Sequence, residues 1–146
     1  MNEIDFPSVS ASLPVRFVIY LPAAKPLDED GAAIEDAVAR ILCERFGGVT
    51  AYPARGTFAL TSGTPQTEPI TVMETYCDEE AWQEHRRGIA TFAAVLAQLL
   101  RQESMGCSVN GRMVLINAPS QSVRGVSLPS TIHGADVYSL LQRAFD

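Results

Sequence analysis

The succession of apolar patterns along the chain restricts its fold more than any other feature of the sequence. Apolar residues recur at three- and four-residue spacing in two long segments, which is typical of amphipathic helices. Runs rich in β-branched and aromatic residues surround these segments and indicate strands. The predicted elements are a strand at 15–21, a helix at 31–46, strands at 49–60 and 70–77, a helix at 79–103, and one or two strands within 107–117.

Local signals mark the ends of these elements. Pro22 ends the first strand, and Gly47-Gly48 supplies a left-handed turn after the first helix. Asp78 is the predicted N-cap of the second helix. Asn110-Gly111 is a favoured two-residue hairpin turn.

The region between the two middle strands carries weaker signals. Pro53 and Gly56 interrupt the segment 49–60, which predicts a bulge or a position at the edge of the sheet. The segment Thr61 to Pro69 contains three Thr, two Pro and one Gly, so we expect a polar turn there.

The resulting order is strand, helix, strand, strand, helix, strand. This order predicts an α+β fold, the ferredoxin-like βαββαβ sandwich, whose four-stranded, mainly antiparallel sheet carries two helices on one face. We assign residues 1–117 to this domain. Residues 118–146 are interpreted as a Pro- and Ser-rich linker and a short amphipathic helix, and we expect the domain to fold without them.

Short motifs add a family resemblance. Phe46-Gly47-Gly48-Val49-Thr50, then Gly56, Glu74 and Gln102-Glu103-Ser104, resemble the pattern of small uncharacterised bacterial domains of the ferredoxin-like fold. The resemblance covers residues 15–117 and excludes the C-terminal extension. It implies the same fold, and it carries no activity that could be transferred to this chain.

Charge is distributed unevenly. The formal net charge is −6, which argues against direct nucleic-acid binding because that depends on cationic contacts to phosphates. Residues 1–103 contain 15 acidic and 8 basic side chains. The clusters Asp28-Glu29-Asp30 and Asp78-Glu79-Glu80 fall at the starts of the two predicted helices, where carboxylates stabilise the helix dipole. The acidic surface would suit a basic partner.

Composition also indicates where the protein acts. The N-terminus carries acids where a secretory signal would carry basic residues, and no apolar run reaches eighteen residues, so we expect a cytoplasmic protein with no membrane partner. Ten of the eleven basic residues are Arg, which favours a GC-rich bacterial source. Cys43, Cys77 and Cys107 are widely spaced, so we interpret them as reduced thiols. The sequence contains neither G-x-x-x-x-G-K-[ST] nor G-x-G-x-x-G, the two glycine-rich motifs that bind nucleotide phosphates. We expect no metal and no cofactor.

The sheet face without helices holds the main candidate site. An ionised Glu74 beneath two apolar helices would be costly, so we place it on the opposite face. Strand alternation adds six residues to that face, namely Arg16, Val18, Tyr20, Ile70, Val72 and Tyr76. This face is apolar enough to need a cover, either a second copy or the helix 137–145. Glu74 either pairs with Arg16 or takes a ligand-binding or catalytic role.

The histidines are weaker candidates. His85 lies on the apolar stripe of the second helix, where it is either a histidine at the edge of the core or a general base. His133 falls in the linker and is interpreted as solvated.

Two function classes follow. The first is a non-enzymatic acidic protein, a bacterial or mobile-element accessory, that binds or inhibits a macromolecular partner through its sheet face and tail. The second is a small-ligand domain or simple enzyme of the dimeric α+β-barrel type, with a pocket between the sheet and its cover. An enclosed cavity of roughly a few hundred cubic ångströms on the Glu74 face would favour the second class, and a sheet face packed solid against a partner or the tail would favour the first. The candidate face residues are Arg16, Tyr20, Glu74, Tyr76 and His85, and the candidate tail residues are Val137, Leu140, Leu141 and Phe145.

Overall fold

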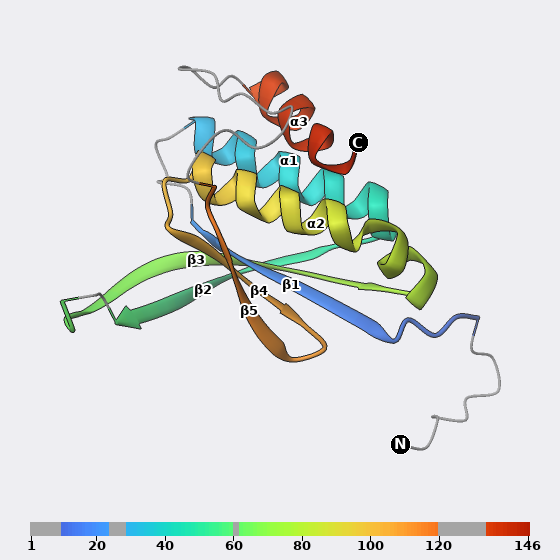
Figure 1. Ribbon diagram of the computed structural model, residues 1–146, viewed down its shortest axis with the longest axis horizontal. Helices are drawn as coiled ribbons and strands as arrows, with labels where there is room; N and C mark the ends of the chain where they lie inside the picture. Colours follow the sequence, from blue (N-terminus) through green and yellow to red (C-terminus); the bar gives the residue numbers. More distant parts are fainter. Residues whose placement is uncertain (1–9, 24–28, 60–61, 120–133) are drawn as a thin grey trace.

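A five-stranded sheet forms the base of the protein in a computed structural model, which describes residues 10–23, 29–59, 62–119 and 134–146. The strand order is β2-β3-β1-β4-β5, and every neighbouring pair is antiparallel. The elements in chain order are β1 (Val15–Pro22), α1 (Glu29–Phe46), β2 (Thr50–Ala59), β3 (Pro65–Cys77), α2 (Glu79–Leu99), β4 (Ser104–Val109), β5 (Arg112–Asn117), α3 (Gly134–Gln142) and the 3-10 helix η1 (Arg143–Phe145). Helices α1 and α2 cover one face of the sheet (Figure 1). The predicted α+β fold is confirmed.

The sheet has one strand more than the four predicted. Asn110 and Gly111 have φ angles of 51° and 82°, and these left-handed values fit a two-residue hairpin turn. The chain therefore reverses directly, and β5 pairs with β4 from Val109↔Arg112 to Ser104↔Asn117.

The β2–β3 hairpin is longer than predicted. The expected polar turn at 61–69 is largely strand, because β3 begins at Pro65. The register runs without a slip from Thr50↔Glu74 to Ala59↔Pro65, so β2 contains no bulge. Of the two expectations for this segment, the edge position is confirmed. An edge strand tolerates Pro53, whose missing N–H can lie on the unpaired side.

Helix α2 begins as predicted and ends early. The Asp78 carboxylate accepts a hydrogen bond from the Ala81 N–H at 2.7 Å, which confirms the N-cap. The helix ends at Leu99 because Arg101 takes a left-handed φ of 55°. The Gln102 N–H then donates to the Ala97 carbonyl at 2.8 Å, the pattern of a Schellman motif. Closure by Arg in place of Gly explains why no sequence signal marked this end.

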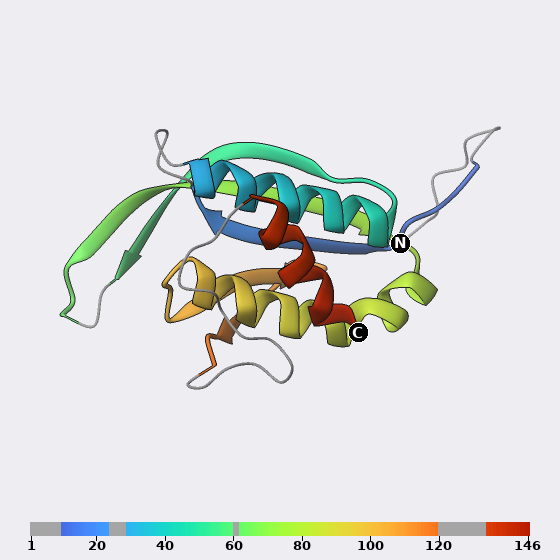
Figure 2. The same cartoon turned by 90° about the horizontal axis from the view of Figure 1, so that it is seen from above.

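The C-terminal helix packs on the helical layer. Helix α3 crosses α1 and α2 on the side away from the sheet (Figure 2). Val137 and Leu141 are fully buried in the same hydrophobic cluster as the sheet and the other two helices. The alternative in which this helix covers the open sheet face is therefore wrong. The domain division after residue 117 stays a prediction, although α3 contributes to the core of the preceding residues.

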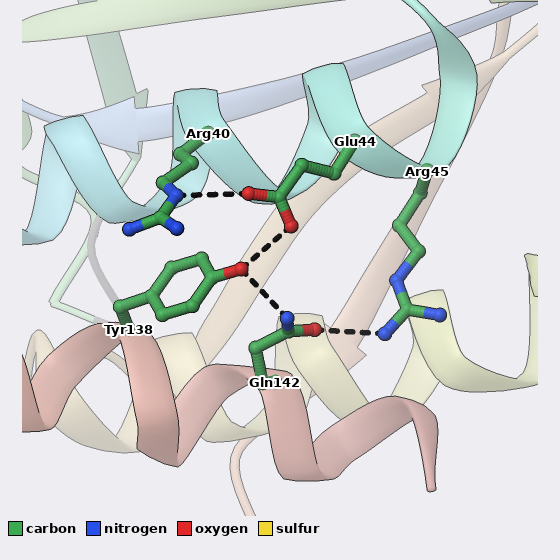
Figure 3. Close-up of polar contacts among 5 residues, drawn as sticks. All are labelled: Arg40, Glu44, Arg45, Tyr138 and Gln142. Atoms are coloured by element: carbon green, nitrogen blue, oxygen red, sulfur yellow. Dashed lines mark hydrogen bonds and ion pairs between the residues drawn. The ribbon is translucent and has the colours of Figure 1, made fainter.

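Polar contacts join α3 to α1 (Figure 3). The Tyr138 hydroxyl donates to Glu44 Oε2 at 2.6 Å and accepts from Gln142 Nε2 at 2.7 Å. Arg45 donates to Gln142 Oε1 at 2.7 Å. The Arg40 guanidinium lies 3.9 Å from the centre of the Tyr138 ring and donates to Glu44 Oε1 at 2.8 Å. These contacts fix the orientation of α3, whose apolar face the core already covers.

Candidate functional site

The face of the sheet opposite the helices, here called the open face, carries four of the candidate residues. Antiparallel pairing sets Arg16 opposite Tyr76 and Tyr20 opposite Val72, so their side chains share one face. Glu74 lies on this face as well, between Thr50 and Val18 in the register. The expectation that Glu74 avoids the helical side is confirmed, as is the alternation behind it.

Arg16 and Glu74 form an ion pair on the open face. Arg16 Nε donates to Glu74 Oε2 at 3.0 Å, and its Nη2 contacts the same oxygen. The Glu74 side chain is 18% exposed and that of Arg16 is 38% exposed. Hydrogen bonding to the carboxylate raises the pKa of Arg16. The pairing of Glu74 with Arg16, which is the alternative to a ligand-binding or catalytic role for Glu74, is thus present in the structure.

A small second core covers the middle of the open face. Val18, Ile70 and Val72 are buried there, and Tyr20 and Ala54 pack against them. This cluster is separate from the main core under the helices. Two aromatic side chains at its border, Tyr52 and Tyr76, are 42% and 45% exposed.

A groove of about 990 Å³ lies at one end of the open face. Residues of the β2–β3 hairpin and of the β4–β5 hairpin form its two walls, and the segment between α2 and β4 contributes to its rim. Tyr20 is the candidate residue that lines it. Most of the other lining residues were not candidates, and they include Gly56, Phe58, Gln66, Glu68, Arg101, Glu103, Gly106, Met113 and Leu115.

Two glycines shape the floor of the groove. A Cβ atom at Gly56 would lie 2.5 Å from the Phe58 ring, so this ring rests over bare backbone. A Cβ atom at Gly106 would lie 3.1 Å from the Met113 Cε and 3.8 Å from the Tyr20 Cδ2. Glycine inside a strand often marks a close approach of a ligand or another group to the backbone. In the sequence only Gly56 has an aromatic residue nearby, Phe58 two positions later, and no local signal marks Gly106.

The rim of the groove carries charges of both signs. Glu68 and Glu103 supply carboxylates, and Arg101 supplies a guanidinium. An apolar floor with a few polar groups around it is the usual form of a small-molecule site.

His85 lies in the helical layer, so the structure separates it from the other face residues. Its ring is 5.6 Å from the Phe46 ring and 6.2 Å from the Phe145 ring, both edge-on. Its Nε2 is 3.8 Å from Glu84 Oε2. These contacts match a histidine at the edge of the core. His133 lies outside the described residues.

The tail candidates are also in the helical layer. Val137, Leu140 and Leu141 are at most 5% exposed, and Phe145 is partly buried against the core. A partner could reach these side chains only if α3 left α1 and α2. The predicted tail and the predicted face are therefore on opposite sides of the molecule.

The cysteines and acidic residues form no further centre in the described part of the chain. Cys43 is exposed, and Cys77 and Cys107 are buried free thiols. Burial raises the pKa of Cys107 to about 12, which disfavours the reactive thiolate. Among the described residues, no group of three His, Cys, Asp or Glu side chains could hold a metal ion. No helix within those residues has the length and apolarity to cross a membrane.

No known family model matches the chain, and no curated protein matches its sequence. Similar solved structures include a phage SAM lyase in complex with S-methyl-5'-thioadenosine, at 16% identity and a TM-score of 0.53, covering 79% of this chain and 100% of that chain. A phage SAM lyase in the apo state matches at 14% identity and a TM-score of 0.54, over 81% and 100% of the two chains. The periplasmic divalent cation tolerance protein CutA from Archaeoglobus fulgidus matches at 10% identity and a TM-score of 0.42, over 90% and 98%. At these identities the likeness to the phage SAM lyases shows the fold alone, and the chain has a ferredoxin-like α+β fold.

Proposed function

We propose that this protein binds a small molecule in the groove of the open face, and that the ligand is a nucleoside of the S-adenosylmethionine class. The observation that carries the proposal is the groove itself, about 990 Å³ on the same face as Glu74. A cavity on that face is what distinguishes a small-ligand domain from a surface used only by a macromolecular partner.

The lining of the groove supports this ligand chemistry. A purine ring is flat, and over the backbone of Gly106 such a ring would meet only the ends of the flexible Met113 and Leu115 side chains and the edge of the Tyr20 ring. Tyr20 and Phe58 offer aromatic surface beside it. S-adenosylmethionine carries a sulfonium cation and a carboxylate, which would suit the acidic and basic side chains of the rim.

The structural likeness supports the choice of probe. A phage SAM lyase with S-methyl-5'-thioadenosine bound has the same fold over its full length. That ligand belongs to the lyase, and its transfer to this chain is part of the proposal.

The test is isothermal titration calorimetry with S-adenosylmethionine and with S-methyl-5'-thioadenosine. Gly106→Val places a side chain on the groove floor, where the first atom that it meets is the end of the flexible Met113 side chain. We expect the wild type to bind at least one probe and Gly106→Val to lose at least tenfold in affinity. Tyr52→Ser changes an exposed residue of the same face outside the groove and should bind as the wild type does. Absence of binding by the wild type, or equal binding by Gly106→Val, would contradict the proposal.

A second candidate function rests on the exposed aromatic residues of the open face. Tyr52 and Tyr76 lie beside the Arg16–Glu74 pair, and exposed aromatic and Arg side chains are enriched in protein interfaces. In this alternative the protein is a cytoplasmic bacterial or mobile-element accessory that binds a basic macromolecule, or a second copy of itself, through that face. Affinity capture from the native host tests it with Tyr52→Ser/Tyr76→Ser and Glu74→Ala variants. A partner captured equally by the variants and the wild type would exclude the open face as its binding surface.

A further inference from the structure

The outermost strand β5 carries three exposed apolar side chains, which alternate between the two faces of the sheet. Met113, Val114 and Leu115 are 53%, 38% and 66% exposed, and they are consecutive in the chain. β5 ends the sheet on this side and pairs with β4 alone among the described residues. An exposed apolar edge strand is a ready template for pairing with another strand.

The backbone groups of this edge can be assigned from one hydrogen bond. The Ala118 N–H donates to the Glu103 carbonyl at 2.9 Å, which continues the β4–β5 ladder by one residue. In an antiparallel ladder, inward and outward backbone groups alternate along the strand. The N–H and C=O groups of the even-numbered residues of β5 therefore point toward β4. Met113, Leu115 and Asn117 direct their N–H and C=O groups outward.

The opposite edge of the sheet is protected. β2 contains Pro53, which has no N–H and interrupts the row of donors in the first half of the strand. β5 contains no proline, and its register with β4 shows no bulge. Of the two edges, β5 is therefore the one with an unbroken set of pairing groups.

We propose that a second copy of this chain pairs antiparallel with β5 about a two-fold axis at Val114. In this register Met113 lies opposite the partner's Leu115, and Val114 lies opposite the partner's Val114. Side chains of opposed residues then lie on the same face of the sheet. The outward N–H and C=O groups of Met113 hydrogen-bond to those of the partner's Leu115, and the same holds with the two chains exchanged. The most exposed apolar side chains also cover one another. A shift of one residue in register would oppose side chains of different faces. An axis at Leu115 would set Met113 against Asn117.

The pairing would produce a continuous ten-stranded sheet with the helices of both copies on one side. Met113 and Leu115 also line the groove, so the second copy would lie against the groove wall. The proposal concerns assembly and stands apart from the identity of the ligand.

The test combines size-exclusion chromatography and light scattering with substitutions that place opposite charges at Val114, the residue on the proposed two-fold axis. The wild type should elute with twice the 15.8 kDa mass of one chain. Val114→Lys and Val114→Glu each set two like charges opposite one another, so each variant alone should be monomeric. A one-to-one mixture of the two variants should dimerise again, because Lys then opposes Glu. This recovery also shows that both variants are folded.

Tyr52→Lys is the matched control, since it places the same charge on an exposed residue of the open face. It should remain dimeric. Hydrogen exchange at the N–H groups of Met113 and Leu115 should slow as the wild-type concentration rises. A monomeric wild type, a mass of three chains, a dimer that survives Val114→Lys, or a dimer lost with Tyr52→Lys would each overturn the proposal. Calorimetry on Val114→Lys measures ligand binding separately, so failure of one proposal does not imply failure of the other.

Discussion

Tyr138 of α3 donates its hydroxyl proton to the Glu44 carboxylate of α1 across 2.6 Å. This bond, together with the hydrogen bond from Arg40, lowers the pKa of Glu44 below its ordinary 4.5. The same bond is the main cause of a raised pKa for Tyr138, above its ordinary 10.0. The contact is therefore strongest while Glu44 is ionised and Tyr138 keeps its proton.

The stability that this contact adds should depend on pH at both ends. The depressed pKa of Glu44 means that its contribution is present above about pH 4.5 and is lost as the pH falls through the folded-state pKa. The raised pKa of Tyr138 means that its contribution is present below about pH 10 and is lost as the pH rises further. We expect the difference in urea midpoint between the wild type and Tyr138→Phe to be largest between these limits. A difference that is constant from pH 3 to pH 11 would contradict this.

The thiols should react in a fixed order. Cys43 is exposed, whereas Cys77 and Cys107 are buried and burial raises the pKa of both. We expect Ellman's reagent to modify one thiol rapidly in the native protein and all three in denaturant. Cys43→Ser should abolish the rapid phase. Rapid modification of a second thiol in native buffer would show that a buried cysteine is accessible.

The C-terminal helix should contribute to the stability of the whole domain. Leu141 is fully buried, and replacing it with Ala should cost about 2–5 kcal/mol in the free energy of unfolding. Leu13 is 48% exposed, and Leu13→Ala should change stability by about 0.5 kcal/mol at most. Urea unfolding followed by circular dichroism measures both. Equal effects of the two variants would show that α3 is not part of the core.

Local sequence signals predicted the elements because each acts within a few residues. The structure confirms three such predictions, namely the alternation along β1, the N-cap at Asp78 and the turn at Asn110-Gly111. The extra length of β3 escaped prediction, because residues 65–69 form strand only through pairing with β2. The docking of α3 escaped it as well, because an apolar stripe predicts burial without naming the surface that covers it.

The candidate site was predicted in part for the same reason. Alternation along each strand placed Tyr20 and Glu74 on one face, because the side chains of every second residue point to the same side of the sheet. The groove lies between two hairpins that are distant in sequence, so no local pattern predicts it. Its floor includes Gly56 and Gly106, and a glycine has no side chain from which a binding role could be inferred. His85 was grouped with the open face although its helix was predicted on the other face, and its ring contacts lie in the helical layer.

Gly88 of α2 faces the Phe145 ring, and the space between them permits no side chain. A Cβ atom at Gly88 would overlap the ring, with the Phe145 Cε1 only 2.9 Å away. Ala is ordinarily favoured over Gly inside a helix by about 1 kcal/mol. Here Gly88→Ala should instead lower the urea midpoint, because Phe145 must leave its place on α2.

The matched variant is Phe145→Ala, which removes the ring that Gly88→Ala would displace. In that background Gly88→Ala should stabilise the protein by about 1 kcal/mol, since the helix preference then acts without the clash. Urea unfolding of the four proteins of this double-mutant cycle gives the coupling between the two positions. If Gly88→Ala stabilises the wild type and the Phe145→Ala variant equally, the C-terminal turn does not pack on α2 in solution.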